Sequence, residues 1–210
     1  MHHTKSPSPY HTQPSLVFGF HACERSIGEL LLSGEAGFKP SENDFDWLGH
    51  GMYFWENSLT RAQEYAQELA TKRQKIKAPF VIGAVINLGY CFDLTDAFSL
   101  NLLETEYQNM AKLFAKADVP MPENQQAFKN DTDFLFRKLD CAVIEYMHQM
   151  IDEENRKAFD TVRGVFWEGD PLYPTSGFKK KNHVQLCIRN PNAIKGYFRP
   201  LDINPNYDLV

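Results

Sequence analysis

The stretch Asn43–Ala66, NDFDWLGHGMYFWENSLTRAQEYA, decides how the rest of the chain is interpreted. It begins as a polar loop rich in Asn, Asp and Gly, and then predicts a short strand over 51–55. The Asn-Ser pair that follows is a helix-capping signal, so we expect an amphipathic helix from Ser58 to about residue 75. The stretch therefore predicts an aromatic strand face beside a glycine-lined loop.

The centre of this stretch suits the binding of a flat ligand. Gly49 and Gly51 flank His50, so the backbone can turn tightly there or let a ligand approach closely. Tyr53 follows on the strand with a ring that can stack on such a ligand. A core strand capped by a turn explains the same residues without any function, and both interpretations stay open at this point.

Bulk composition predicts a single soluble domain. The chain has 210 residues with 43% hydrophobic and 23% charged residues, which are globular values. It contains no apolar run of the ~18 to 20 residues that a membrane span needs. The net charge of −5 excludes a molecule that attracts nucleic acid over its whole surface, so an anionic partner would need a local basic patch.

Residues 1–15 are predicted to be a flexible tail, because they are rich in proline and histidine and hold no apolar segment. The remaining residues, 16–210, are expected to form the domain. The four cysteines have neither a Cys-x-x-Cys spacing nor a pattern typical of a disulfide framework, which favours a reducing cytoplasm. They are Cys23, Cys91, Cys141 and Cys187.

Hydrophobic patterning predicts an α+β fold in which strands from both ends of the chain share a sheet. The section from about 96 to 160 has two amphipathic stripes, the second beginning at Phe134, and is expected to be a helical insertion. The predicted strands are 16–21, 51–55, 80–88, 161–167, 183–189 and 194–199.

Three pieces of this sequence together resemble the ADP-ribosyltransferase superfamily, on its diphtheria-toxin and poly(ADP-ribose)-polymerase side. The first is the strand LVFGFH, 16–21, which ends in His21. The second is GMYF, 51–54, followed by the helix, and the third is the late strand HVQLCIRNPNAI, 183–194, preceded by a long loop. The resemblance implies a split β-sheet core with NAD as a substrate, and it does not extend to the helical section.

The resemblance also implies roles for individual residues. His21 would donate a hydrogen bond to a ribose hydroxyl, and the backbone of Ala22 would bind the nicotinamide carboxamide. Tyr53 would stack on the nicotinamide ring, while Gly51 and Ala62 complete the NAD-binding motif. No metal is implied, and His50 and His183 have no third ligand at a useful spacing.

Gln185 occupies the position where this superfamily has its catalytic glutamate. Its amide can still hydrogen-bond a ribose hydroxyl, but it supplies no negative charge and takes no proton. Chain extension is therefore not expected, whereas a single transfer to a reactive nucleophile is. Glu56 and Glu168 are the nearest carboxylates by topology if one is required.

The loop 168–182 is the expected target-binding element, because the corresponding loop helps to choose the target in the superfamily. Its aromatic residues beside clustered lysines favour nucleic acid, perhaps RNA, slightly over protein as the acceptor. A run of lysines is more often simply a solvated surface. The residues concerned are Tyr173, Phe178, Lys179, Lys180 and Lys181.

The predicted function is mono-ADP-ribosyl transfer from NAD, as in bacterial toxins and defence effectors, with an antitoxin or inhibitor protein as a possible partner and no membrane. One alternative is an NAD-binding or ADP-ribose-binding module without activity, as Gln185 suggests. Another is an NAD glycohydrolase that uses water as its acceptor. A structural role for His21 and a core role for Tyr53 are the explanations that involve no ligand.

Overall fold

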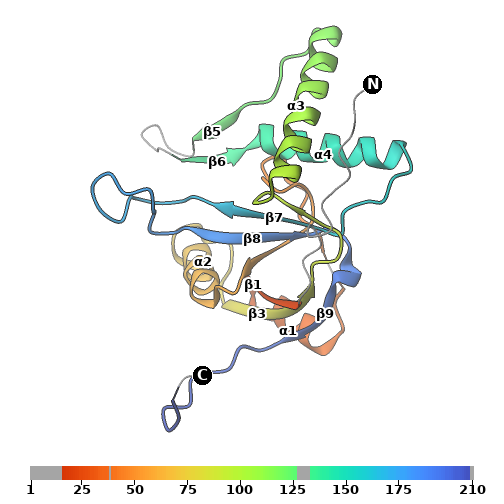
Figure 1. Ribbon diagram of the computed structural model, residues 1–210. Helices are drawn as coiled ribbons and strands as arrows, with labels where there is room; N and C mark the ends of the chain where they lie inside the picture. Colours follow the sequence, from red (N-terminus) through yellow and green to blue (C-terminus); the bar gives the residue numbers. More distant parts are fainter. Residues whose placement is uncertain (1–15, 38, 127–132, 209–210) are drawn as a thin grey trace.

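The computed structural model describes residues 16–37, 39–126 and 133–208 (Figure 1). The tail predicted for residues 1–15 lies outside this range. Within it, a large mixed sheet and four α-helices form the α+β fold that the sequence predicts. No helix in the described part of the chain is both long and apolar enough to cross a bilayer.

Seven strands form the main sheet in the order β4-β7-β8-β2-β1-β3-β9. All neighbouring pairs are antiparallel except β4 and β7. Strands from the first and last thirds of the chain are thus interleaved, as expected. Their bounds are β1 (Leu16–Glu24), β2 (Met52–Glu56), β3 (Pro79–Asn87), β4 (Cys91–Asp93), β7 (Thr161–Phe166), β8 (His183–Ile188) and β9 (Ile194–Phe198), with a 3-10 turn η1 (Pro191–Ala193) before β9.

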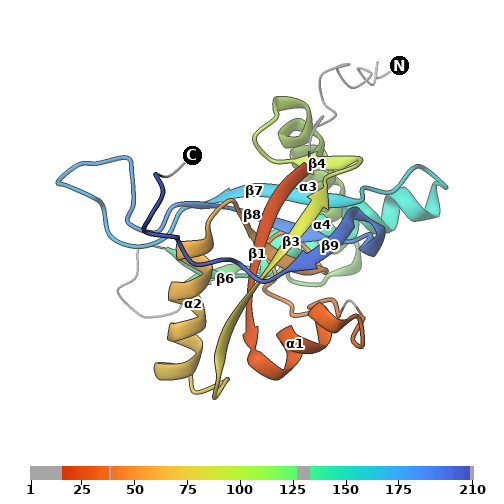
Figure 2. The ribbon, with the colours of Figure 1, turned by 90° about the horizontal axis from the view of Figure 1, so that it is seen from below.

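The helices are α1 (Arg25–Ser33), α2 (Leu59–Thr71), α3 (Ala97–Ala117) and α4 (Lys138–Glu153). Figures 1 and 2 show α1 and α2 beside β1 and β3, and α3 and α4 together on the side of β7. The alternation of side chains along β2 separates two faces: Met52 and Phe54 belong to the cluster that includes Leu31 of α1. Tyr53 and Trp55 point to the other face, where α4 and α2 pack.

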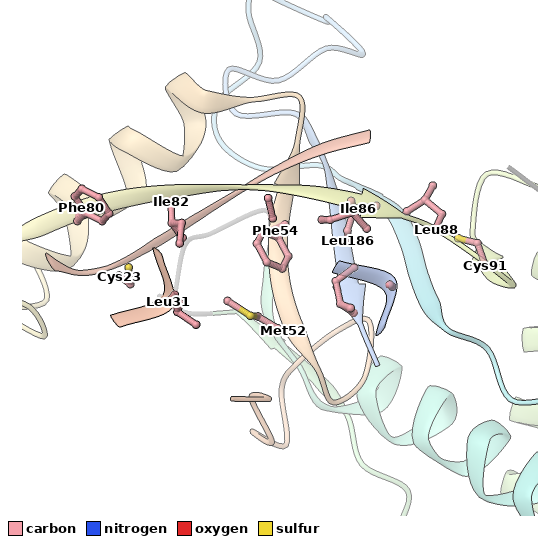
Figure 3. Close-up of a cluster of buried hydrophobic side chains, with 13 residues drawn as sticks. Cys23, Leu31, Met52, Phe54, Phe80, Ile82, Ile86, Leu88, Cys91 and Leu186 are labelled. Atoms are coloured by element: carbon pink, nitrogen blue, oxygen red, sulfur yellow. The ribbon is translucent and has the colours of Figure 1, made fainter. Parts of the chain in front are cut away.

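The main hydrophobic cluster lies between the central strands and α1 (Figure 3). Phe54, Ile82 and Leu186 have no exposed surface there. Because β3 is buried on both faces, its sequence FVIGAVIN is apolar almost throughout and does not alternate. This packing fixes β1, β2 and β8, the three strands that carry His21, Tyr53 and Gln185.

Helix ends follow the sequence signals in part. Gly34 ends α1 in the left-handed conformation (φ 76°), which glycine adopts readily. Ser58 precedes α2 without making a side-chain cap, and α2 ends at Thr71, earlier than expected. Asp96 caps α3 by accepting hydrogen bonds from the backbone N–H groups of Phe98 and Ser99.

The section predicted to be all helical also contains strands. Residues 134–137 form β6 (Phe134–Arg137), which pairs with β5 (Asn124–Gln126), and α4 begins only afterwards. The prediction of a helix from Phe134 is therefore wrong at its start. The run FLFR has only four residues, too few for the spacing of its apolar side chains to distinguish a helix from a strand. Pairing with β5 makes it a strand. The short strand β4 was also missed.

Candidate functional site

The pairing of β1 and β2 lasts for only two residue pairs. Gly19 pairs with Glu56 and Phe20 with Trp55, after which the register between the two strands ends. Beyond Phe20, β1 stays paired with β3 while β2 stays paired with β8. The two strands therefore diverge inside the sheet, and His21 and Tyr53 lie just beyond the point of divergence.

A cavity of about 680 Å³ opens at this point, within the usual size range of small-molecule sites. It brings together five of the residues predicted for NAD binding and catalysis, from three distant segments: His21, Ala22, Gly51, Tyr53 and Gln185. Ala62 does not line the cavity. It is fully buried behind it, in the cluster formed by α2 and β1.

His21 bridges the diverging strands through a hydrogen bond of 2.7 Å between its Nδ1 and the Tyr53 carbonyl. A carbonyl only accepts, so Nδ1 carries the hydrogen. Burial lowers the pKa of His21, and the bond to Tyr53 raises it by less, so the ring is neutral and Nε2 has a free lone pair. Nε2 of His21 can thus accept a hydrogen bond but has no hydrogen to donate, the reverse of the donation expected from the sequence.

The hydroxyl of Tyr53 is fully engaged by the glycine-lined loop. It donates to the Gly49 carbonyl at 2.8 Å and accepts from the Leu48 N–H at 3.0 Å. Burial raises the pKa of Tyr53 well above its ordinary value, which keeps the hydroxyl protonated. The hydroxyl therefore holds the loop, and only the ring of Tyr53 remains for a ligand in the cavity.

Gln185 lies in the centre of the cavity face of the sheet, opposite Trp55 on β2 and Gly164 on β7. A side chain at Gly164 would collide with the Trp47 ring, since a Cβ there would lie 2.8 Å from it. The Trp47 indole N–H uses this space to donate to Gln185 Oε1 at 2.6 Å. An indole N–H is a donor only, so this bond fixes the amide orientation and leaves its NH2 group as the free donor.

The Gly49–Gly51 loop is held from below by an ion pair. Glu145 of α4 pairs with Arg189 and accepts from the His50 N–H at 2.8 Å, while Arg189 donates to the His50 carbonyl at 3.0 Å. Hydrogen bonds and the charge of Arg189 hold the pKa of Glu145 below its usual range, although burial acts in the opposite direction. Gly49 has a positive φ of 79°, and Gly51 lies too close to the Ile188 carbonyl for a side chain.

Of the two carboxylates suggested by topology, only Glu168 lines the cavity. It pairs with Arg61 at 3.0 Å and with Lys181 at 3.6 Å. Glu56 instead forms a hydrogen-bonded ion pair with Arg163 on β7, at 2.6 Å. Of these two carboxylates, Glu168 is therefore the one at the cavity, where Arg61 and Lys181 hold it.

Cationic side chains dominate the cavity wall. Lys39, Arg61, Arg73 and Lys75 line it, against the carboxylates of Asp46 and Glu168. Arg73 also lies over the Tyr65 ring, 5.4 Å from its centre. The cavity wall thus has a local excess of positive charge in a chain of net charge −5.

The lysines of the loop between β7 and β8 are all paired. Lys179 contacts Asp133, Lys180 lies 3.3 Å from Asp170, and Lys181 lies 2.8 Å from Glu68. These three residues do not line the cavity, and neither do Tyr173 and Phe178, which are exposed. The expected target-binding loop thus presents aromatic rings to solvent, while its lysines are neutralised by carboxylates.

Several cavity residues were not predicted from the sequence, among them Trp47, Trp55, Arg61 and His183. The aromatic contacts run from Tyr65 through Trp55 and His183 to Phe166, with ring centres 5.0 to 6.1 Å apart. Alternation offered one signal, because His183 lies two residues from Gln185 on the same strand face. No group of three or more His, Cys, Asp or Glu side chains suited to a metal occurs among the residues described.

Comparisons with known proteins add one distant relative. The chain is similar to an uncharacterized protein of Methanocaldococcus jannaschii, MJ0359, with 25% identity over 198 residues, covering 84% of this chain and 83% of that protein. No family model matches the chain. No solved structure matches it either.

Proposed function

We propose that this protein is an NAD-dependent mono-ADP-ribosyltransferase of the ADP-ribosyltransferase fold. The observation that carries the proposal is the meeting of His21, Tyr53 and Gln185, from three distant segments, at one cavity beside the diverging strands β1 and β2. These are the three positions at which the sequence resembles that superfamily. Their convergence at one cavity supports the proposal, although the strands that carry them, β1, β2 and β8, are neighbours in the sheet.

The cavity chemistry supports NAD as the substrate. The free ring of Tyr53 suits a flat nicotinamide, and His21 Nε2 suits a ribose hydroxyl. The diphosphate of NAD carries two negative charges, which the cationic side chains Lys39, Arg73 and Lys75 can bind.

The reaction breaks the bond between nicotinamide and ribose, and positive charge builds on the sugar as it breaks. Among the residues described, the cavity carboxylates are Glu168 and Asp46, and Asp46 accepts from the backbone N–H of Asn43 at 2.8 Å. Gln185 contributes its NH2 group as a donor to the ribose. In this proposal the cavity binds the ribose and the nicotinamide that leaves. The attacking group belongs to a macromolecular acceptor, with nucleic acid slightly favoured over protein.

A second candidate is a binding module for NAD or ADP-ribose without transferase activity. The Trp47–Gln185 bond favours it, because the amide oxygen is occupied and no charge replaces the missing glutamate. An NAD glycohydrolase remains a third alternative that differs only in using water. A cytoplasmic role in defence or as a toxin, with an inhibitor protein as partner, belongs to the same proposal.

Gln185→Glu separates the first two candidates. Glutamate would keep one oxygen on the Trp47 N–H and place the other, charged, toward the ligand. We expect the native protein to release nicotinamide from NAD in the presence of cellular RNA or protein. A native protein that binds NAD but releases none, with release appearing in Gln185→Glu, would establish the binding module instead.

A further inference from the structure

Unpaired polar atoms gather at one end of the cavity. Among the residues described, four buried side chains have a nitrogen without a hydrogen-bond partner: Trp55 at Nε1, Arg61 at Nε and Nη1, His183 at Nε2 and His148 at Nε2. The first three line the cavity, and His148 does not. Native proteins pair nearly all buried polar groups, so three such residues at one place indicate a missing partner.

These three residues are neighbours. The ring centres of Trp55 and His183 are 6.1 Å apart, and the charge of Arg61 is close enough to lower the pKa of His183. Arg61 is only 6% exposed, and its Nη2 reaches Glu168 at 3.0 Å. Its Nη1 has only a longer ion-pair contact, 3.5 Å, with Glu64.

The unpaired atoms have defined roles. Trp55 Nε1 and both unpaired nitrogens of Arg61 can only donate. His183 Nδ1 is bonded to the Lys181 carbonyl at 2.6 Å, so it carries the hydrogen and Nε2 has a lone pair. Burial lowers the pKa of His183 more than this bond raises it, which favours the neutral ring. A matching ligand presents acceptor atoms beside an N–H or O–H group.

The surrounding rings define the shape of that ligand. Tyr65, Trp55, His183 and Phe166 form a continuous aromatic wall. Such walls stack nucleobases without regard to sequence. Nucleotides combine a planar ring, acceptor atoms and an N–H or O–H nucleophile, whereas most amino-acid side chains lack the planar part.

We propose that Trp55, Arg61 and His183 form the acceptor subsite, which takes one nucleotide of a single-stranded nucleic acid, with His183 Nε2 receiving the proton of the attacking N–H or O–H. The proposal rests on the transferase function above. It places the acceptor at the end of the cavity next to the β7–β8 loop, two residues along β8 from Gln185. All three side chains contribute to the cavity wall while their unpaired nitrogens lie buried beneath it, so the proposal includes a rearrangement of these side chains when the acceptor binds.

The chemical step balances without another reactant. The acceptor N or O forms a bond to C1 of the nicotinamide ribose while the bond from C1 to the nicotinamide nitrogen breaks. The electron pair of that bond stays with nicotinamide, which leaves uncharged. The proton of the acceptor passes to His183 Nε2, and the carboxylate of Glu168 stabilises the resulting imidazolium.

The test uses the full chain and NAD labelled in its adenylate phosphate. The acceptors are single-stranded oligonucleotides of 20 identical nucleotides, one for each base, made both as RNA and as DNA; these are the homopolymers below. His183→Asn keeps a donor for the Lys181 carbonyl and removes the base at Nε2. His148→Asn is the matched control, because His148 has the same pattern, with Nδ1 bonded to the Ile144 carbonyl and Nε2 unpaired, away from the cavity. Trp55→Phe keeps an aromatic ring and removes the indole N–H.

We expect the native chain and His148→Asn to label at least one homopolymer equally. His183→Asn should label it at least about a hundredfold more slowly, with the NAD dissociation constant within twofold of native. Trp55→Phe should raise the KM for the homopolymer about fivefold and leave that for NAD unchanged. Labelling of RNA but not DNA would assign the nucleophile to the 2′-hydroxyl, and base-selective labelling of both would assign it to the base.

Undiminished labelling by His183→Asn overturns the proposal, as does a native chain that labels proteins of a cell extract but no homopolymer. If His183→Asn does not fold, an unchanged homopolymer KM in Trp55→Phe overturns the subsite on its own. A native chain that releases no nicotinamide in any mixture overturns the transferase function itself, so the two failures are distinguishable.

Discussion

The cavity beside β1 and β2 and the groove between α3 and α4 differ in how their polar groups are paired. The groove is the larger, at about 880 Å³. Most of its polar side chains are paired: Glu145 pairs with Arg189, and Asp160 accepts from the Tyr90 N–H and from Asn190, while His148 alone of the described groove residues has a buried nitrogen, Nε2, without a partner. The cavity is smaller, and Trp55, Arg61 and His183 have unpaired nitrogens there.

On the proposed function, the larger of the two hollows is not the ligand site, so size alone does not mark one. Polar groups that are paired hold elements of the fold in place, as Glu145 and Arg189 hold the loop at His50. Unpaired buried groups cost folding free energy and are retained where a ligand completes them. Substitutions in the groove should therefore affect stability, whereas substitutions in the cavity should affect activity.

The largest effect on stability is expected from Glu145→Ala. It leaves Arg189 without its carboxylate and the His50 N–H without its acceptor, so the free energy of unfolding should fall by about 2 to 3 kcal/mol. Gln149→Ala is the control on the same helix, because Gln149 is exposed and bonds only to Glu153. Urea denaturation measures both, and a loss below about 1 kcal/mol for Glu145→Ala would show that the pair does not hold the loop.

The next effect is a loss of stability in mild acid. Burial lowers the pKa of His148 to about 4, below the unfolded value of 6.5. Between these two pKa values the imidazole is protonated in the unfolded chain and neutral in the folded one. The free energy of unfolding is therefore highest above about pH 6.5 and decreases as the pH falls toward 4. His148 alone should cost about 2 kcal/mol between pH 7 and pH 5.

His21 and His183, whose pKa values are also lowered, add to this loss in the same direction. Urea midpoints measured between pH 7 and pH 5 test the prediction. His148→Asn should show a smaller decline than the native chain. Equal declines in the two proteins would contradict the assignment to His148.

A smaller difference in stability is expected between substitutions of the two buried tryptophans, Trp47 and Trp55. Trp47→Phe and Trp55→Phe lose the same part of the ring, but only Trp47 has a hydrogen bond, the one to Gln185. Trp47→Phe should therefore be less stable than Trp55→Phe by about 1 to 2 kcal/mol. Thermal unfolding of both variants measures the difference, and equal stabilities would mean that the Trp47–Gln185 bond contributes nothing.

The smallest effect is expected in the loop between β7 and β8. Lys180 and Asp170 are both largely exposed, so Lys180→Ala should change the free energy of unfolding by less than about 0.5 kcal/mol. Lys181→Ala should cost more, because Lys181 contacts both Glu68 and Glu168 and all three are partly buried. Equal costs measured in urea would show that burial does not strengthen these pairs.

The sequence predicted most strands and helices of the fold well, because local patterns of side chains determine them. The apolar run of β3, for example, is readable from neighbouring residues alone. The strand predicted to end at His21 instead continues to Glu24, because its pairing with β3 extends to Pro79. Strand 134–137 was mistaken for helix because its apolar residues fit both periods and its partner β5 gave no sequence signal.

Five of the predicted residues line one cavity, whereas the long-range pairs around it were not predicted. Trp47 and Gln185 are 138 residues apart, and Lys181 and Glu68 are 113 apart, so no spacing rule joins them. The lysine triplet therefore seemed to be an available basic patch when its charges are paired. The direction of the His21 hydrogen bond likewise depends on the Tyr53 carbonyl, which only the fold brings near.

The most direct test of the central claim is nicotinamide release from NAD, with added cellular RNA and protein, by the native chain and three variants. His21→Ala and Tyr53→Ala remove cavity groups, and Tyr146→Ala removes a tyrosine that lines the α3–α4 groove. We predict release by the native chain and by Tyr146→Ala, and at least about a hundredfold slower release by the two cavity variants. Release that persists in both cavity variants, or none from the native chain, would contradict the account.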